Sequence, residues 1–134
     1  MAAPAWLIGG LVFGALALAT SPSATQRQQK TDARRIRQTA DRRLLRRLVQ
    51  IAEGGRKART RAIAWQGASL FKQHWIDAGR SGDRPPAGFR REFYGHWCGP
   101  GYGSGRCIDE IDCACKDHDY QYEYAAQVED GLAG

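Results

Sequence analysis

The 134-residue sequence has no internal repeat, only four cysteines, and no aromatic residues interleaved with its basic segment. The cysteines do not form the paired Cys-x-x-Cys knuckles typical of structural zinc sites. Single-stranded nucleic acid is usually bound by alternating aromatic and basic side chains, and that pattern is missing too. These absences disfavour zinc and nucleic acid as ligands. The length allows one domain at most.

The formal net charge of +6 is distributed unevenly along the chain. Residues 1–91 contain 18 Lys or Arg against 5 Asp or Glu, whereas residues 92–134 contain 2 against 9. The sequence is therefore a basic arm followed by an acidic module.

Residues 1–24 form a first segment, in which the stretch from Met1 to Thr20 is almost wholly apolar. Its length suits a signal-peptide core and is marginal for a membrane span, which needs about 20 residues. The Ala17-Leu18-Ala19 cleavage pattern favours a signal peptide. However, all the positive charge follows the run, which is the arrangement of a cytoplasmic anchor. We favour export, and expect a secreted or membrane-associated protein.

Residues 25–87 read as a basic helical region and linker. A polar linker is expected over residues 21–30, followed by a helix with Thr31 as its N-cap and Asp32 in its first turn. Gly54-Gly55 ends this helix. Apolar residues recur along it at spacings of three and four: Ile36, Ala40, Leu44, Leu48 and Ile51. This spacing predicts one buried stripe.

A second helix is predicted over residues 58–78, ending at Gly79, with a loop in "SGDRPPAG". Its expected inner face consists of Ile63, Leu70, Phe71, Trp75 and Ala78. His74 is interpreted as structural. Arginines cover much of the first helix: Arg34, Arg35, Arg37, Arg42, Arg43, Arg46 and Arg47. They suit anionic lipid or nucleic-acid phosphate, or are the solvated face of a helical hairpin.

Residues 88–134 contain a glycine-rich loop and a helix. Glycines at 99, 101, 103 and 105 predict a loop from Trp97 to Arg106, and a helical pattern follows from Ile108. At about 100° per residue, one arc of that helix collects many ionisable groups. The arc contains Asp112, Cys115, His118, Asp119 and Tyr122, with Ile108, Ile111 and Ala126. Burying so many ionisable groups is costly, which indicates a functional site.

The chemistry of this site follows from its residue types. A glycine loop can turn several backbone carbonyls toward one point, and carbonyls with the Asp119 carboxylate suit Ca²⁺. His118 then lies beside the metal with a ring nitrogen able to activate water. A metal that polarises an ester carbonyl next to a histidine base is a hydrolytic centre.

Two motifs carry a family resemblance: Tyr94-Gly95-x-Trp97-Cys98-Gly99-Pro100-Gly101, then Asp109-x-x-Asp112-x-x-Cys115-x-x-His118-Asp119-x-x-Tyr122. Together they resemble the calcium loop and active-site helix of the secreted phospholipase A2 superfamily. The bee-venom type and the phospholipase domains of parvovirus capsid proteins are nearest. The resemblance covers under a quarter of the chain, and the pairing of loop and helix in order and spacing is fairly specific.

The resemblance implies a role for each matching residue. Calcium would be held by the carbonyls of Trp97, Gly99 and Gly101 and by the carboxylate of Asp119. His118 would be the general base for water attacking the sn-2 ester of a phospholipid, and the Gly99 amide would stabilise the oxyanion.

Two further expectations come from the same resemblance. Tyr122 would help hold the carboxylate that orients the histidine. Cys98 and Cys115 would form the disulfide that ties the loop to the helix.

The sequence departs from the family pattern in three respects. Ala114 and Gln121 replace family cysteines, and Cys107 and Cys113 have no family counterpart. Cys107 reaches Cys113 only if the chain bends before the helix, because six helical residues span about 9 Å. The family's histidine-orienting Asp comes from a later antiparallel helix, whereas only fifteen residues follow Asp119 here. We therefore expect an upstream carboxylate, Asp77, to approach His118 or Tyr122.

Three functions stay open on the sequence: a calcium-dependent phospholipase A2, which we favour; a non-catalytic calcium- or membrane-binding module; and a zinc- or nucleic-acid-binding protein. Four clustered cysteines suit disulfides and an oxidising compartment. The expected partner is a phospholipid membrane surface, with anionic lipid on the arginine-rich helix. The oligomeric state is left open. The fold expected is mainly α: a basic helical hairpin followed by the loop and active-site helix.

Overall fold

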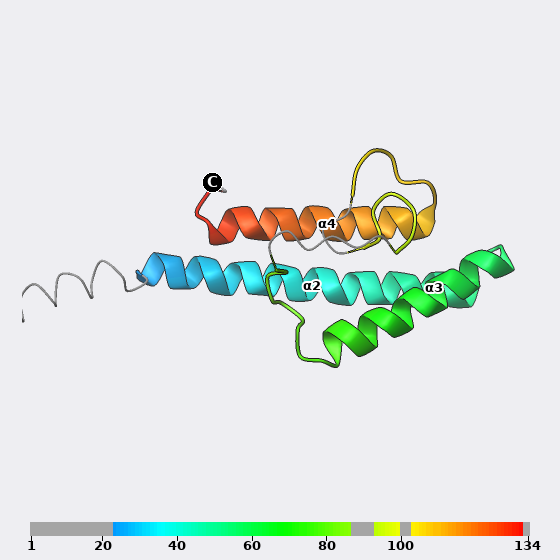
Figure 1. Cartoon of the computed structure of the whole chain (residues 1–134). Helices are drawn as coiled ribbons and strands as arrows, with labels where there is room; N and C mark the ends of the chain where they lie inside the picture. The colour runs from blue at the N-terminus through cyan, green and yellow to red at the C-terminus, as the bar shows by residue number, and fades with distance from the viewer. Residues whose placement is uncertain (1–22, 87–92, 100–102, 133–134) are drawn as a thin grey trace, which may run out of the picture.

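The computed structural model describes residues 23–86, 93–99 and 103–132. The expected signal peptide or anchor falls almost entirely on residues outside these ranges and stays a prediction. None of the described helices combines the length and apolarity needed to cross a membrane. The described part of the chain is mainly helical, as predicted, and contains no β-strand, only an isolated bridge between Tyr94 and Cys98 (Figure 1).

The first described helix, α2, spans Ala24–Gly54. Ser23 caps it, because its side chain accepts from the Gln26 amide while the Gln26 side chain accepts from the Ser23 amide. This capping box satisfies two otherwise unpaired amides at the helix start. The predicted N-cap at Thr31 is therefore wrong. The predicted linker over residues 21–30 is wrong from residue 24 onward, because those residues belong to α2. Gln, Arg and Lys are good helix formers even without an apolar stripe.

The buried face of α2 follows the predicted stripe and extends it. Ala40, Leu44, Leu48 and Ile51 are buried, and Ile36 is half-buried. Three further buried residues lie on the same side of the helix: Ala33, Arg37 and Asp41. Two of these are charged, so the core contains ionic groups that the apolar pattern did not reveal.

The second helix, α3, spans Ala58–Phe71 and continues into a π-helical turn, η1, over Lys72–Ile76. Its start, and the glycine turn at Gly79, are as predicted. The predicted inner face is only partly right. Leu70 and Ala78 are exposed, and the residues buried in α3 are Ala64 and Ala68. Ile63 and Phe71 pack at the edge of the core. Small side chains at the contact let two helices approach closely.

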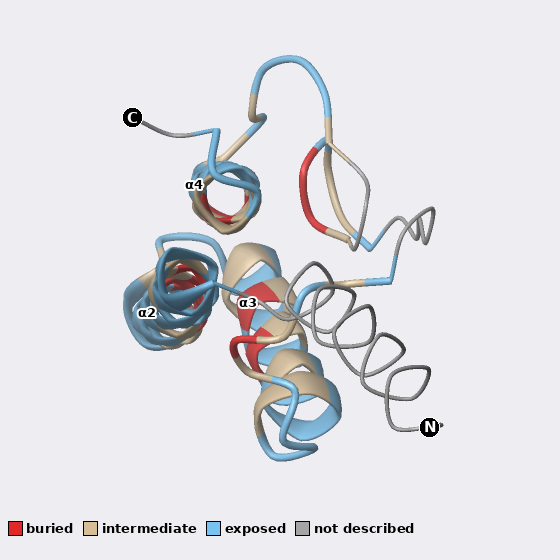
Figure 2. Cartoon of the chain, turned by 90° about the vertical axis from the view of Figure 1, so that its left-hand side faces the viewer, coloured by how far each residue is buried: buried red, intermediate tan, exposed pale blue. Residues whose placement is uncertain are grey.

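The third helix, α4, spans Glu110–Glu129 and is capped by Asp109, whose side chain accepts from the Asp112 amide. It lies antiparallel along α2, while α3 crosses α2 at an angle (Figure 1). The buried sides of the three helices face one another (Figure 2).

Ion pairs record the antiparallel register of α2 and α4. Arg37 pairs with Glu129, Arg43 with Asp117, and Arg47 with Glu110, so partner numbers fall along α4 as numbers rise along α2. The acidic C-terminal module is thus a partner of the basic arm within the same chain. Packing of the arginine-rich helix on a second helix, one of the open interpretations, is present, and α4 is an additional neighbour.

Candidate hydrolytic site

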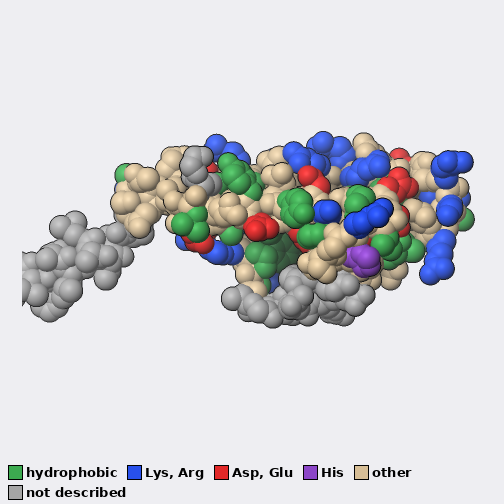
Figure 3. All heavy atoms as spheres, turned by 90° about the horizontal axis from the view of Figure 1, so that it is seen from above, with side chains coloured by type: hydrophobic (Ala, Val, Ile, Leu, Met, Phe, Trp, Pro, Cys, Tyr) green, Lys and Arg blue, Asp and Glu red, His purple; other side chains and the backbone are tan. Residues whose placement is uncertain are grey.

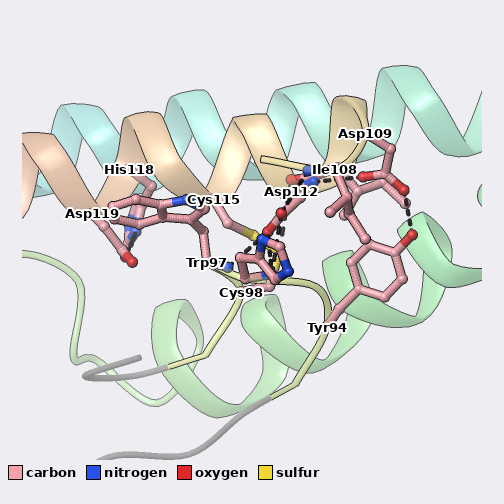
Figure 4. Close-up of a disulfide and its surroundings, with 11 residues drawn as sticks. Tyr94, Trp97, Cys98, Ile108, Asp109, Asp112, Cys115, His118 and Asp119 are labelled. Carbon is pink, nitrogen blue, oxygen red and sulfur yellow. Dashed lines mark hydrogen bonds and ion pairs between the residues drawn. A yellow bond between two sulfur atoms is a disulfide. The ribbon is translucent and has the colours of Figure 1, made fainter. Parts of the chain in front are cut away.

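The loop that precedes α4 is fixed to the helix by a disulfide between Cys98 and Cys115, with their Cα atoms 5.0 Å apart (Figure 4). This is the pairing that the resemblance implied. The loop folds on itself through the Tyr94–Cys98 bridge, in which each backbone amide donates to the other residue's carbonyl. The Tyr94 hydroxyl donates to Asp109, and this hydrogen bond raises the pKa of Tyr94 to about 12.

A second disulfide joins Cys107 and Cys113, whose Cα atoms are also 5.0 Å apart. Because α4 begins at Glu110, the chain bends between the two cysteines, which is the condition that the sequence set for this pair. The described part of the chain has no free cysteine.

Asp112 holds the loop from within α4. Its side chain is fully buried and accepts from the backbone amides of His96, Trp97 and Ile108, at 2.7 Å for Trp97 and 2.9 Å for Ile108. These amide donors replace the hydrogen bonds to water that the carboxylate loses on burial. Asp112 stood in the sequence motif without a role, and its role here is to anchor the loop (Figure 4).

His118 is paired with Asp41 of α2. The His118 Nε2 atom lies 2.7 Å from Asp41 Oδ1, and the Tyr122 hydroxyl donates to the same oxygen at 2.7 Å. The predicted partner, Asp77, is wrong: its side chain is 55% exposed and pairs with Lys72. The carboxylate that pairs with His118 does come from upstream in the sequence, as expected, but it belongs to α2. In the sequence Asp41 lies among seven arginines, and no spacing signal there marks it as a partner for His118.

Burial and hydrogen bonds shift the pKa of each group in this trio. Burial raises the pKa of Asp41, but hydrogen bonds from His118 and Tyr122 outweigh it, so the net pKa lies below the ordinary value. Burial lowers the pKa of His118, yet contacts with Asp119 and Asp41 leave it raised. Burial and the bond to Asp41 raise the pKa of Tyr122, which keeps its hydroxyl protonated as a donor.

The remaining ring nitrogen of His118 lies on the side of Asp119. His118 Nδ1 lies 3.8 Å from Asp119 Oδ1, too far for a hydrogen bond. The Phe71 ring meets the histidine edge-on, with centroids 5.6 Å apart. With Nε2 engaged by Asp41, Nδ1 is the nitrogen available to a water or substrate.

Asp119 lies close to the glycine loop at Gly103. A Cβ on Gly103 would lie 3.1 Å from Asp119 Oδ2 and would collide with the Trp97 ring, so only glycine lets the chain pass this close to the carboxylate. The Trp97 indole donates to the Gly105 carbonyl at 3.0 Å and fixes the loop's far side. Burial raises the pKa of Asp119, and Asp112 adds to the rise. A cation bound at Asp119 would stabilise the ionised form of this part-buried carboxylate, which the charge of Asp112 disfavours.

The donor types expected for Ca²⁺ are a carboxylate and backbone carbonyls. Asp119 would provide the carboxylate, and the carbonyls of Trp97 and Gly99 belong to described residues. The third carbonyl, from Gly101, lies outside the described residues. Within the described ranges, no group of three or more His, Cys, Asp or Glu side chains is placed to hold a metal. The predicted site uses one carboxylate and backbone oxygens, so it needs no such group.

Comparison with known proteins found no matching family model, no matching curated protein and no matching solved structure. The case for a function thus rests on the motif and on the geometry of the site.

Proposed function

We propose that this protein is a calcium-dependent phospholipase A2 that hydrolyses the sn-2 ester of glycerophospholipids to lysophospholipid and fatty acid. The observation that carries the proposal is the placement of His118 between Asp41 and Asp119. One ring nitrogen is held by the Asp41 carboxylate at 2.7 Å, and the other lies 3.8 Å from Asp119 Oδ1.

The residues of this chain divide the reaction between them. Asp41 holds the Nε2 proton, so that Nδ1 of His118 accepts a proton from the attacking water and returns it to the lysophospholipid oxygen as the ester C–O bond breaks. The Gly99 amide donates to the oxyanion that forms at the ester carbon. Tyr122 donates to Asp41 and keeps that carboxylate in place. Asp119 and the loop carbonyls would hold Ca²⁺, which would supply polarisation of the ester carbonyl.

A non-catalytic calcium- or membrane-binding module is the alternative. Its support was the lack of a residue to orient the histidine after Asp119. Asp41 supplies that carboxylate from α2, at 2.7 Å from the ring nitrogen. We therefore favour the enzyme.

Fatty-acid release from vesicles of mixed phospholipids, measured with calcium and with a chelator, tests the proposal. Release only with calcium is the expected result. Equal release in both conditions would remove calcium from the mechanism, and no release in either would leave the non-catalytic module. Analysis of the products separates sn-2 from sn-1 cleavage.

A further inference from the structure

The second carboxylate oxygen of Asp41 has its own set of donors. Whereas Oδ1 receives His118 and Tyr122, Oδ2 receives the indole N–H of Trp75 at 3.0 Å and the hydroxyl of Ser81 at 2.9 Å. The Gly82 amide adds a longer contact at 3.4 Å. Asp41 is fully buried, and both of its oxygens are thereby hydrogen-bonded.

These donors come from one continuous segment after α3. Trp75 lies in the π-helical turn η1, and Ser81 and Gly82 lie in the turn that follows Gly79. π-helical turns recur at functional sites, because they shift the side chains that follow relative to a regular helix. This segment folds back over α2 at the position of Asp41.

The segment is itself fixed against α2. The Arg37 guanidinium donates through Nε to the Gly82 carbonyl at 2.7 Å. Gly82 has a φ of 91°, and a Cβ there would lie 2.7 Å from the Gln38 side chain, so the turn needs glycine to approach this closely. The donors to Oδ2 therefore have defined positions.

A carboxylate bonded through one oxygen alone can rotate about its χ2 angle, which is a broad torsion. Donors on Oδ2 oppose that rotation. The His118 ring then has one preferred partner for Nε2, and the tautomer with its proton on Nε2 is favoured.

We propose that Trp75 and Ser81 are positioning residues, which lock the Asp41 carboxylate so that His118 keeps its proton on Nε2 and presents a bare Nδ1 to the reacting water. The link to water rests on the proposed hydrolysis, whereas the effect on the histidine tautomer does not. Within the described residues, neither side chain is hydrogen-bonded to His118.

The test compares Trp75→Phe with Trp65→Phe in the full chain. Phenylalanine keeps an aromatic side chain but removes the indole N–H together with the five-membered ring, and Trp65→Phe makes the same change away from Asp41. Trp65 is also on the α3 side of the molecule, but it is 60% exposed and bonds to none of the site residues. The readout is the pair of ¹⁵N shifts of the His118 ring, recorded at a pH where the imidazole is neutral.

The share of the Nε2–H tautomer should fall in Trp75→Phe and stay unchanged in Trp65→Phe. Hydrolysis should lose about tenfold in kcat, the usual effect of one hydrogen bond to a charged group. KM and calcium affinity should stay within about twofold, because the hydrogen bond from Trp75 to Asp41 does not involve the glycine loop. An unchanged tautomer in Trp75→Phe would overturn the proposal.

Ser81→Ala and Ser81→Thr provide a second route that does not disturb a large side chain. Alanine should shift the tautomer in the same direction, and threonine, which keeps a hydroxyl, should restore it. If alanine and threonine behave alike, the hydroxyl has no positioning role. If the tautomer responds as expected while the unmodified protein releases no fatty acid, the positioning role stands and the enzymatic proposal fails.

Discussion

At the scale of single residues, the adjacent side chains of His118 and Asp119 make different contacts. His118 and Asp119 are adjacent in sequence, but His118 is engaged by Asp41 of α2, while Asp119 approaches the glycine loop at Gly103. A base and a metal ligand should respond differently to substitution.

Asp119→Asn should abolish both calcium binding and hydrolysis, because the only side-chain ligand loses its charge. His118→Gln should lower kcat by about 10²–10⁴-fold while calcium affinity changes only a few-fold, since general-base catalysis is typically of that size. Calorimetric calcium titration and fatty-acid release measure the two effects. Equal loss of calcium in both variants would contradict this division of roles.

Asp112→Asn should destabilise the fold, because the amide replaces two acceptor oxygens by one and places a donor against backbone N–H groups. A loss of about 2–4 kcal/mol in the free energy of unfolding is expected for a buried, multiply bonded charge. Calcium affinity should fall as well, since His96 and Trp97 lose their anchor. Denaturant unfolding and calcium titration measure these changes.

Asp117 on the same helix is half-exposed and makes only a 3.3 Å ion pair with Arg43. Asp117→Asn is therefore the matched control and should change stability by less than about 1 kcal/mol. Similar losses in the two variants would show that loop anchoring is not the cause.

At the scale of elements, the contact between α2 and α4 is held partly by a buried ion pair. The Arg37 side chain is 4% exposed and donates to Glu129 at 2.9 Å. Burial raises the pKa of Glu129, but hydrogen bonds and charge from Arg37 and Arg84 leave the net pKa below the ordinary value. Protonating Glu129 therefore weakens the packing of these helices.

The sign of the pH dependence follows from that lowered pKa. The stabilisation by Glu129 is fully present above its pKa in the unfolded chain, about 4.3. It is lost as the pH falls through the lower pKa of the folded state. Urea unfolding of the unmodified protein and of Glu129→Gln should differ most above the unfolded-state pKa and converge below the folded-state pKa.

Glu123→Gln is the control on the same helix, because Glu123 is exposed and makes no ion pair within the described residues. Its unfolding free energy should follow that of the unmodified protein at every pH. A constant gap between Glu129→Gln and the unmodified protein in acid would mean that ionisation of Glu129 is not responsible.

At the scale of the whole molecule, some arginines of α2 pair with carboxylates of α4, and others pair with no described carboxylate. Basic side chains gather along one long edge and at one end of the face in Figure 3. Arg43 and Arg47 of α2 pair with α4, whereas Arg35, Arg42 and Arg46 are exposed and pair with no carboxylate of a described residue. The loop lies on the side of α3 and α4 away from α2 (Figure 2).

Reversing the charge of Arg35, Arg42 and Arg46 together should weaken binding to anionic vesicles, by about 1 kcal/mol per basic residue near the surface. Binding to zwitterionic vesicles should be unchanged, and added salt should reproduce the loss. Vesicle co-sedimentation measures both. Equal loss of binding to anionic and zwitterionic vesicles would mean that these arginines act in packing or solvation and not in lipid binding.

The sequence by itself determined the local features of this protein. The glycine spacing gave the loop, the period of three and four gave the buried stripe of α2, and one arc of α4 collected His118, Asp119 and Tyr122. The Cys98–Cys115 pair followed from the motif resemblance. Each of these depends on residues close together in the chain, where spacing fixes geometry.

Only the tertiary structure decided which carboxylate meets His118. Asp41 and His118 are 77 positions apart, and nothing in the pattern near Asp41 separates it from the charged face around it. The register of α2 against α4, which Arg37–Glu129 and Arg47–Glu110 record, brings that side chain to the ring. Asp77 is also an upstream aspartate, but it lies at an exposed turn and pairs with Lys72. Pairings between distant helices depend on how whole faces pack, which local spacing does not encode.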